Sequence, residues 1–193
     1  MKNFLHDYSY STIKMFVNQF AISLFGAMLS MATTAAENDG LAIVLSCLAI
    51  VFYLFLIYTL IWEVGAKDRI SVDIKKKTKH IHTGVIIALI ANIPNFLIAI
   101  AYSIGHPFMA TEKWAGTLCM ISSFLTMLFE GMYLGIITTV EVSGNLLNHY
   151  WWTYFVITIP AILVSWAAYY FGFKNKKMTT LFDYRNPDKT KRK

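Results

Sequence analysis

Five long apolar stretches, separated by short polar breaks, occupy most of the 193-residue chain. They cover about residues 13–36, 41–62, 83–104, 116–140 and 152–173. Each is close to the ~20 residues that a helix needs to cross the ~30 Å hydrocarbon core of a bilayer. Because lipid offers no hydrogen bonds to a bare backbone, such stretches must be helices that pair their own N–H and C=O groups. The pattern therefore predicts an all-α, polytopic membrane helix bundle.

Lysine and arginine gather in two segments outside the apolar stretches. The first is a predicted loop over residues 67–82, and the second is the tail over 174–193. The turn at 37–40 has no cation. Because Lys and Arg stay preferentially on the cytoplasmic side, we expect the N-terminus and the 67–82 loop in the cytoplasm. Residues 1–173 then form one domain embedded in the cell membrane.

The cations of these two segments are expected to contact anionic lipid or a cytoplasmic partner. The residues assigned to this surface are Lys75, Lys76, Lys77, Lys79, Arg185, Lys191 and Arg192. Nucleic-acid-binding proteins also carry basic tails, but this tail lacks the Gly or aromatic interleaving of such modules. The expected partners are therefore the lipid bilayer and other proteins, not a nucleic acid.

The basic tail conflicts with a simple count of five spans. Three spans follow the 67–82 loop, and this odd number of crossings would carry the tail to the opposite side. An interruption at Glu130-Gly131 resolves the conflict, because residues 116–150 then form two short segments, or one that enters and returns. We favour six membrane segments with both ends inside over five spans with an exposed tail.

Composition supports the membrane assignment and excludes an ordinary soluble domain. Hydrophobic residues make up 56% of the chain and charged residues 15%, against roughly 25% charged residues in an average soluble domain. Cys47 and Cys119 both fall inside apolar stretches, without a CxxC pattern or a nearby histidine at metal spacing. We therefore expect no disulfide, no metal site and no cofactor.

Glu130 is the first candidate for chemistry. It is the only carboxylate well inside the apolar stretches, and such groups usually face the bundle interior or a water-filled path. Asn92 and Asn95 lie on one face of the third stretch, where Pro94 predicts a kink. If the third and fourth stretches are antiparallel, Asn92 and Glu130 share a depth of roughly 14 Å from one surface. These four residues are candidates for a solute- or ion-binding cavity; the alternative is that the asparagines only join helices.

Small residues mark the predicted helix contacts. Gly131 and Gly135 form a GxxxG, and Gly26 and Ser30 belong to a stripe of small residues in the first stretch. Small side chains let helix backbones approach closely where lipid provides no hydrophobic drive for association. We expect these positions to pack within one chain rather than to form a dimer interface.

No catalytic motif is present: the chain lacks the GxSG of rhomboid-type proteases, HExxH and any nucleotide-binding motif. We therefore expect a protein that binds or transports a small solute, as a subunit of a larger transporter if a partner membrane protein or ATPase supplies energy. Six short helices in a chain of this size resemble, in architecture only, the substrate-binding subunits of vitamin-uptake transporters.

Two other classes of function stay open. The main alternative is a non-catalytic assembly, immunity or regulatory protein that docks a cytoplasmic partner through its basic loop and tail. An intramembrane enzyme that uses Glu130 and a nearby histidine is a third reading, so an enzymatic role is not the favoured one. The Lys- and Asn-rich loops are typical of a bacterial protein from an AT-rich genome.

Overall fold

The computed structural model describes residues 2–75 and 82–176, and nearly all of them are helical. The long helices are α1 (Lys2–Ala35), α2 (Asp39–Asp73), α5 (Lys113–Glu130) and α8 (Ile159–Phe173). The shorter elements are α3 (Thr83–Ala91), α4 (Ile93–Gly105), η1 (His106–Phe108), η2 (Gly131–Tyr133), α6 (Leu134–Ile137), β1 (Glu141–Val142), β2 (Asn145–Leu146), η3 (Leu147–His149) and α7 (Thr153–Val156).

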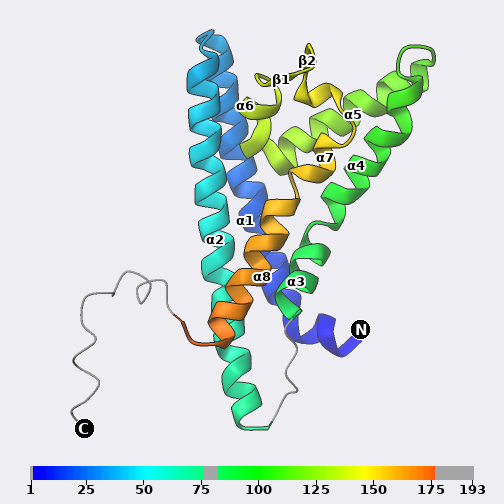
Figure 1. Cartoon of the computed structure of the whole chain (residues 1–193). Helices are drawn as coiled ribbons and strands as arrows, with labels where there is room; N and C mark the ends of the chain where they lie inside the picture. Colours follow the sequence, from blue (N-terminus) through cyan, green and yellow to red (C-terminus); the bar gives the residue numbers. More distant parts are fainter. Residues whose placement is uncertain (1, 76–81, 177–193) are drawn as a thin grey trace.

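α1 and α2 form a long antiparallel pair that runs from one end of the molecule to the other (Figure 1). Asn38 starts α2 as its N-cap, because its side chain accepts a hydrogen bond from Leu41 N at 2.9 Å. α8 packs along the second half of α2. This contact requires a glycine, since a Cβ at Gly172 would lie 2.1 Å from Trp62 O.

Two other helical segments are interrupted inside the bundle. α3 and α4 meet at Asn92 with a bend of 55°. α5 ends at Glu130, and the chain continues through η2 into the single turn of α6. Figure 1 shows that α5 starts at the same end of the molecule at which α6 finishes. Residues 113–137 therefore enter the bundle and return toward the end from which they came.

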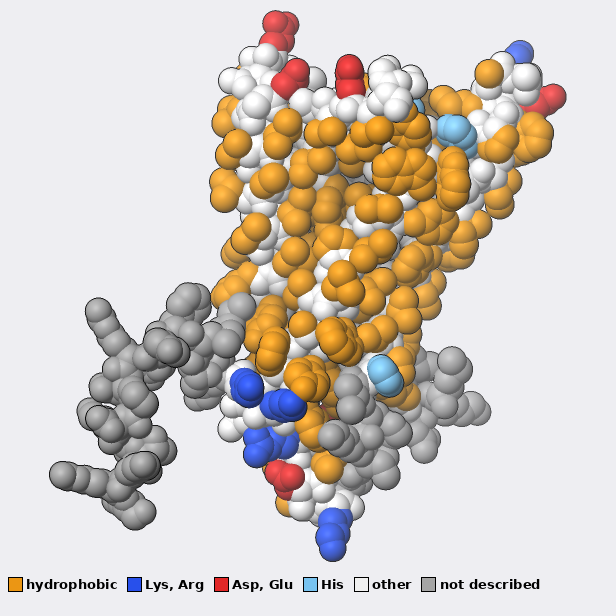
Figure 2. Space-filling view, in the orientation of Figure 1, with side chains coloured by type: hydrophobic (Ala, Val, Ile, Leu, Met, Phe, Trp, Pro, Cys, Tyr) orange, Lys and Arg blue, Asp and Glu red, His pale blue; other side chains and the backbone are white. Residues whose placement is uncertain are grey.

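The two ends of the molecule differ in charge, and hydrophobic side chains cover the outside between them (Figure 2). We call the end with the α1–α2 turn and the β1–β2 hairpin the acidic end, because it carries Glu37, Asp39 and Glu141. The opposite end, where α2 and α8 finish, carries most of the cations of the described residues and is called the basic end. This distribution is that of a helix bundle embedded in a membrane.

The five predicted spans are only partly matched by single long helices. Within residues 2–75 and 82–176, four helices are long and apolar enough to cross a membrane, or five if α3 and α4 count as one bent span. The predicted span over 83–104 is thus two helices, bent at Asn92 close to the predicted kink at Pro94. Pro94 explains the interruption, because its ring cannot donate the backbone hydrogen bond that a straight helix needs there.

The helices extend further at the basic end than their apolar stretches do. α1 begins at Lys2 rather than near residue 13, and α2 continues to Asp73 rather than ending near residue 62. The first part of the expected 67–82 loop is therefore helical. Lys67 and Glu63, one turn apart in α2, form an ion pair of 2.7 Å that supports this extension.

The second short segment predicted within residues 116–150 is only one turn long. α6 ends at Ile137, and the chain then forms the antiparallel β1–β2 hairpin, in which Glu141 pairs with Leu146. Glu141, Ser143 and Asn145 are exposed. These polar residues end the helix because they reach solvent at the acidic end.

Candidate functional site

A hydrogen-bonded cluster of four polar side chains lies near the middle of the bundle. Gln19 of α1 donates from Nε2 to Glu130 Oε1 at 2.8 Å, and Asn95 of α4 donates from Nδ2 to the same oxygen at 2.6 Å. Asn92 Oδ1 accepts from Asn95 Nδ2 at 2.9 Å and from Gln19 Nε2 at 3.4 Å. All four residues are at most 5% exposed. We call this set the Glu130 cluster.

The two helix interruptions bring the Glu130 cluster together. Glu130 is the last residue of α5, at the point where residues 113–137 turn back, and Asn92 lies between α3 and α4. Asn92 also donates from Nδ2 to Ala88 O at 2.9 Å, so its amide serves a backbone carbonyl next to the bend. Gln19 lies 16 residues before the end of α1 at Ala35, about 24 Å along the helix at 1.5 Å per residue. The cluster is therefore far from both ends of the molecule.

The neighbours of each amide determine which of its two polar atoms is the donor. Gln19 Nε2 lies within hydrogen-bonding distance of three acceptors, since Phe129 O is at 3.3 Å in addition to the two oxygens above. Asn95 Nδ2 faces two acceptors, and Asn92 Nδ2 faces Ala88 O. Exchanging N and O in any of these amides would place oxygen against oxygen. The amide N–H groups of the cluster are thus directed at acceptors that are already in place.

Three oxygens of the Glu130 cluster make no hydrogen bond within the described residues: Gln19 Oε1, Asn95 Oδ1 and Glu130 Oε2. Two tyrosine hydroxyls share this condition, one from Tyr53 of α2 and one from Tyr133 of η2. Both tyrosines are buried in one core cluster, and Tyr133 follows Glu130 by three residues. Since a buried polar atom without a partner costs roughly 1–3 kcal/mol, five of them around one carboxyl group form an unusual concentration.

A negative charge on Glu130 would also have no counter-ion. In the part of the chain that the structure describes, the ion pairs involve Asp7, Glu63 and Asp73, and none includes Glu130. A buried carboxylate without a cation is strongly disfavoured in a low-dielectric interior. Two amide donors on one of its oxygens offset only part of that cost.

A second buried carboxylate, Asp68 near the basic end, provides a comparison. It is 6% exposed and accepts hydrogen bonds on Oδ2 from Tyr8 at 2.6 Å and from Tyr169 at 2.9 Å. These contacts join α1, α2 and α8. Within the described residues Asp68 has no buried oxygen that lacks a hydrogen-bond partner, whereas Glu130 Oε2 is such an oxygen.

The predicted small residues lie at the contacts that hold the returning segment in place. A Cβ at Gly131 would lie 2.4 Å from Ser23 O, and one at Gly26 would lie 2.4 Å from Met132 Cα. Gly131 N also donates to Ser23 Oγ. The residues of the GxxxG therefore face two helices: Gly131 faces α1, and Gly135 faces α2, where its Cβ would lie 2.6 Å from Ala42 O. These contacts are all within one chain.

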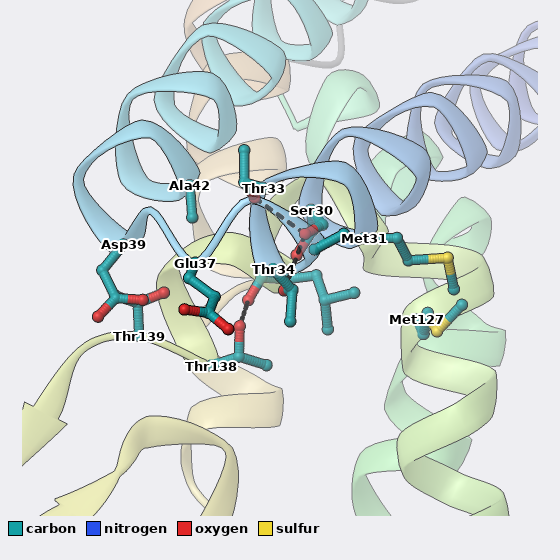
Figure 3. A pocket seen from close by; sticks show the side chains of 12 residues that line it. Ser30, Met31, Thr33, Thr34, Glu37, Asp39, Ala42, Met127, Thr138 and Thr139 are labelled. Carbon is teal, nitrogen blue, oxygen red and sulfur yellow. Dashed lines mark hydrogen bonds between the residues drawn. The ribbon is translucent and has the colours of Figure 1, made fainter.

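A cavity of about 770 Å³ lies at the acidic end, between the α1–α2 turn and α6 (Figure 3). Its wall is rich in hydroxyl groups and carries two carboxylates; these polar residues are Ser30, Thr33, Thr34, Glu37, Asp39, Thr138 and Thr139. Met127 and Leu134 also line it, three residues before and four residues after Glu130. The cavity therefore extends along the same returning segment that carries Glu130 at its tip.

The structure brings together Glu130, Asn92 and Asn95 from the predicted site, with Pro94 in the first turn of α4 beside them. Ser30 lies instead in the wall of the acidic-end cavity. Of the predicted basic surface, Lys75 is exposed after α2, and the other members lie outside the described residues: Lys76, Lys77, Lys79, Arg185, Lys191 and Arg192.

Sequence reasoning missed Gln19, Tyr53 and Tyr133. A signal for Gln19 was present, because it lies four residues before Ser23 and continues the stripe of small residues toward the N-terminus. Tyr53 similarly belongs to the buried face of α2, four residues after Ala49. Neither pattern alone distinguishes a polar site from ordinary helix packing.

No protein-family model matches this chain, and neither a curated protein nor a solved structure shows significant similarity to it.

Proposed function

We propose that this chain is a multi-pass protein of the cell membrane that binds a small polar or charged solute at the Glu130 cluster and takes part in its transport. The observation that supports this function best is the set of five buried oxygens around Glu130 that make no hydrogen bond in the described residues. Ionisable groups inside membrane proteins usually belong to solute or ion pathways. Interrupted helices that meet near the bilayer midplane are a common way of building such sites in transporters.

The proposed topology has four crossings, made by α1, α2, the α3–α4 pair and the α7–α8 pair. The α5–α6 segment enters from the acidic end and returns to it. An even number of crossings keeps the N-terminus and the 174–193 tail on one side. Because the cations gather at the basic end, we place that end in the cytoplasm.

The contrast between Glu130 and Asp68 supports a role in binding rather than in structure. A carboxylate retained only for stability is expected to have its oxygens saturated by fixed donors, as the tyrosines saturate Asp68 Oδ2. Transport driven by ATP would require a partner, because this sequence has no nucleotide-binding motif. A partner membrane protein or ATPase subunit at the basic surface is therefore part of the proposal.

The test is a thermal-shift screen of the full chain, purified in mild detergent, against amino acids, sugars, nucleosides and vitamins. A solute that binds the folded state raises the melting temperature by mass action. We expect stabilisation of the wild type and of the surface control Glu63→Gln, and none of Glu130→Gln. Glu130→Gln keeps the shape of the side chain and an oxygen that accepts both amide donors, so it should fold.

Equal stabilisation of the wild type and Glu130→Gln would place the solute elsewhere. If no solute stabilises the protein and it co-purifies stoichiometrically with a cytoplasmic protein, the alternative of an assembly, immunity or regulatory protein is the correct one.

A further inference from the structure

The atoms of the Glu130 cluster that make no hydrogen bond are all oxygens. One is the carboxylate oxygen Oε2 of Glu130, two are the amide oxygens of Gln19 and Asn95, and two are the hydroxyl oxygens of Tyr53 and Tyr133. The amide N–H groups are directed at acceptors of the cluster itself. The cluster therefore offers a ligand mainly acceptors, and the matching ligand must carry positive charge or hydrogen-bond donors.

We propose that the Glu130 cluster binds one small monovalent metal cation, such as Na⁺ or Li⁺, through these oxygens. This inference rests on the proposed function and names the class of its solute. Hard cations prefer carboxylate, carbonyl and hydroxyl oxygens, in the mixture found here. Within the described residues, no group of three His, Cys, Asp or Glu side chains is arranged for a metal ion, so a transition-metal site is not the alternative.

The net charge of the site selects a monovalent ion. Glu130 is the single carboxylate of the cluster, and the ion pairs of the described residues do not include it. One positive charge cancels it, whereas a divalent ion would leave an uncompensated charge buried far from both ends. A proton also cancels the charge, but it provides a single donor and leaves most of the remaining oxygens without a partner.

A cation site does not require hydrogen bonds between its ligand oxygens. Tyr53 and Tyr133 carry O–H donors, yet neither hydroxyl reaches an acceptor. Two oxygens that bind one ion at about 2.4 Å and at right angles lie ~3.4 Å apart, and opposite ligands lie ~5 Å apart. Ligands of one ion therefore do not need to bond to one another, and the lack of hydrogen bonds at these oxygens agrees with a shared ion.

The acidic-end cavity is the side from which we expect such a cation to approach. Glu37, Asp39 and five hydroxyl side chains line it, and its lining residues nearest to Glu130 in the chain are Met127 and Leu134. Carboxylates at an entrance raise the local concentration of cations. The cation therefore enters from the acidic end, opposite the lysine-rich surface.

The experiment measures the melting temperature of the full chain in mild detergent, with NaCl, LiCl, KCl or choline chloride at constant ionic strength. We expect a saturable rise with Na⁺ or Li⁺ beyond that with choline. The rise should be absent in Glu130→Gln and retained in the surface control Glu63→Gln. Tyr53→Phe removes one proposed ligand but no hydrogen bond of the described structure, so it should fold. Its cation midpoint should move several-fold upward.

Three outcomes would overturn the cation proposal. Equal melting temperatures in all four salts exclude a metal cation, and a stabilisation by acidic pH that Glu130→Gln lacks then assigns the site to a proton. An unchanged cation midpoint in both Glu130→Gln and Tyr53→Phe places the ion elsewhere. After any of these outcomes, the proposed function still holds if an organic solute stabilises the wild type but not Glu130→Gln. It fails as well if no organic solute stabilises the wild type.

Discussion

Substitution of Gly131 by alanine should strongly destabilise the protein, because the new Cβ would collide with the backbone of α1. The ideal Cβ position is 2.4 Å from Ser23 O and 2.9 Å from Ala27 Cβ. Restoring ordinary contacts requires a shift of ~0.6–1 Å between α1 and η2, and overpacking of this kind costs ~1–3 kcal/mol. The shift also weakens the hydrogen bond from Gly131 N to Ser23 Oγ, which contributes ~0.5–1.5 kcal/mol.

The total expected loss is ~2–4 kcal/mol, or roughly 5–15 °C in melting temperature on the scale of soluble domains of this size. Gly116→Ala is the matched control, because a Cβ there meets only Met109 O at 3.7 Å. In α5 that alanine should be neutral or stabilise by up to ~1 kcal/mol. The assay is thermal unfolding in detergent with light scattering to record mass. A Gly131→Ala protein as stable as Gly116→Ala would refute the packing argument, and a change from dimer to monomer would show that Gly131 belongs to an intermolecular contact.

Two further predictions concern topology and the basic end. In a background without native cysteines, a cysteine at Asn38 should react with an impermeant thiol reagent in intact cells, and one at Lys75 should react only after permeabilisation; the reverse pattern would invert the proposed orientation. Tyr169→Phe should lower stability by ~1–3 kcal/mol, because it removes a hydrogen bond to the buried Asp68 carboxylate. Tyr58→Phe, at a half-buried position in α2, is the control and should change the melting temperature little; equal losses in both variants would show that ring packing, not the hydrogen bond, is measured.

The sequence placed Asn92, Asn95 and Glu130 together by a depth count whose premise the structure does not support. A helix rises by a constant 1.5 Å per residue, so positions counted from the ends of apolar stretches can be compared directly between segments. The hydrogen bond of 2.6 Å from Asn95 Nδ2 to Glu130 Oε1 shows that these residues meet. The comparison assumed that residues 116–140 cross fully, whereas α5 ends at Glu130 and the chain turns back. The two counts therefore start from opposite ends of the molecule, since residue 83 begins α3 toward the basic end and residue 140 follows α6 at the acidic end. The residues meet because both counts lead to the middle of the bundle, not because they start from one surface.

The return of the chain after Glu130 could not be read from hydropathy. Residues 113–137 are apolar and long enough to pass as one span by length and composition. Their path depends on contacts between distant residues: Gly131 and Gly135 must approach α1 and α2 respectively. A GxxxG motif predicts a close approach but does not identify the partner helices. For the same reason the sequence pointed to Glu130 and not to Tyr53, which reaches the cluster only through the packing of α2.

The side chains around the two interruptions serve both the backbone and the carboxyl group, which explains why the breaks and the charge occur together. A broken helix leaves backbone groups without partners, and lipid cannot supply them. Asn92 Nδ2 bonds Ala88 O beside the first break, and Ser23 Oγ accepts from Gly131 N at the second. Asn92 Oδ1 accepts hydrogen bonds from the amides of Gln19 and Asn95. These bonds orient both amides so that their N–H groups also donate to Glu130 Oε1. With the donors fixed in this way, Gln19 Oε1 and Asn95 Oδ1 make no hydrogen bond within the described residues. An arrangement that repairs two broken helices thereby also produces the oxygen-rich surroundings on which the proposed cation site depends.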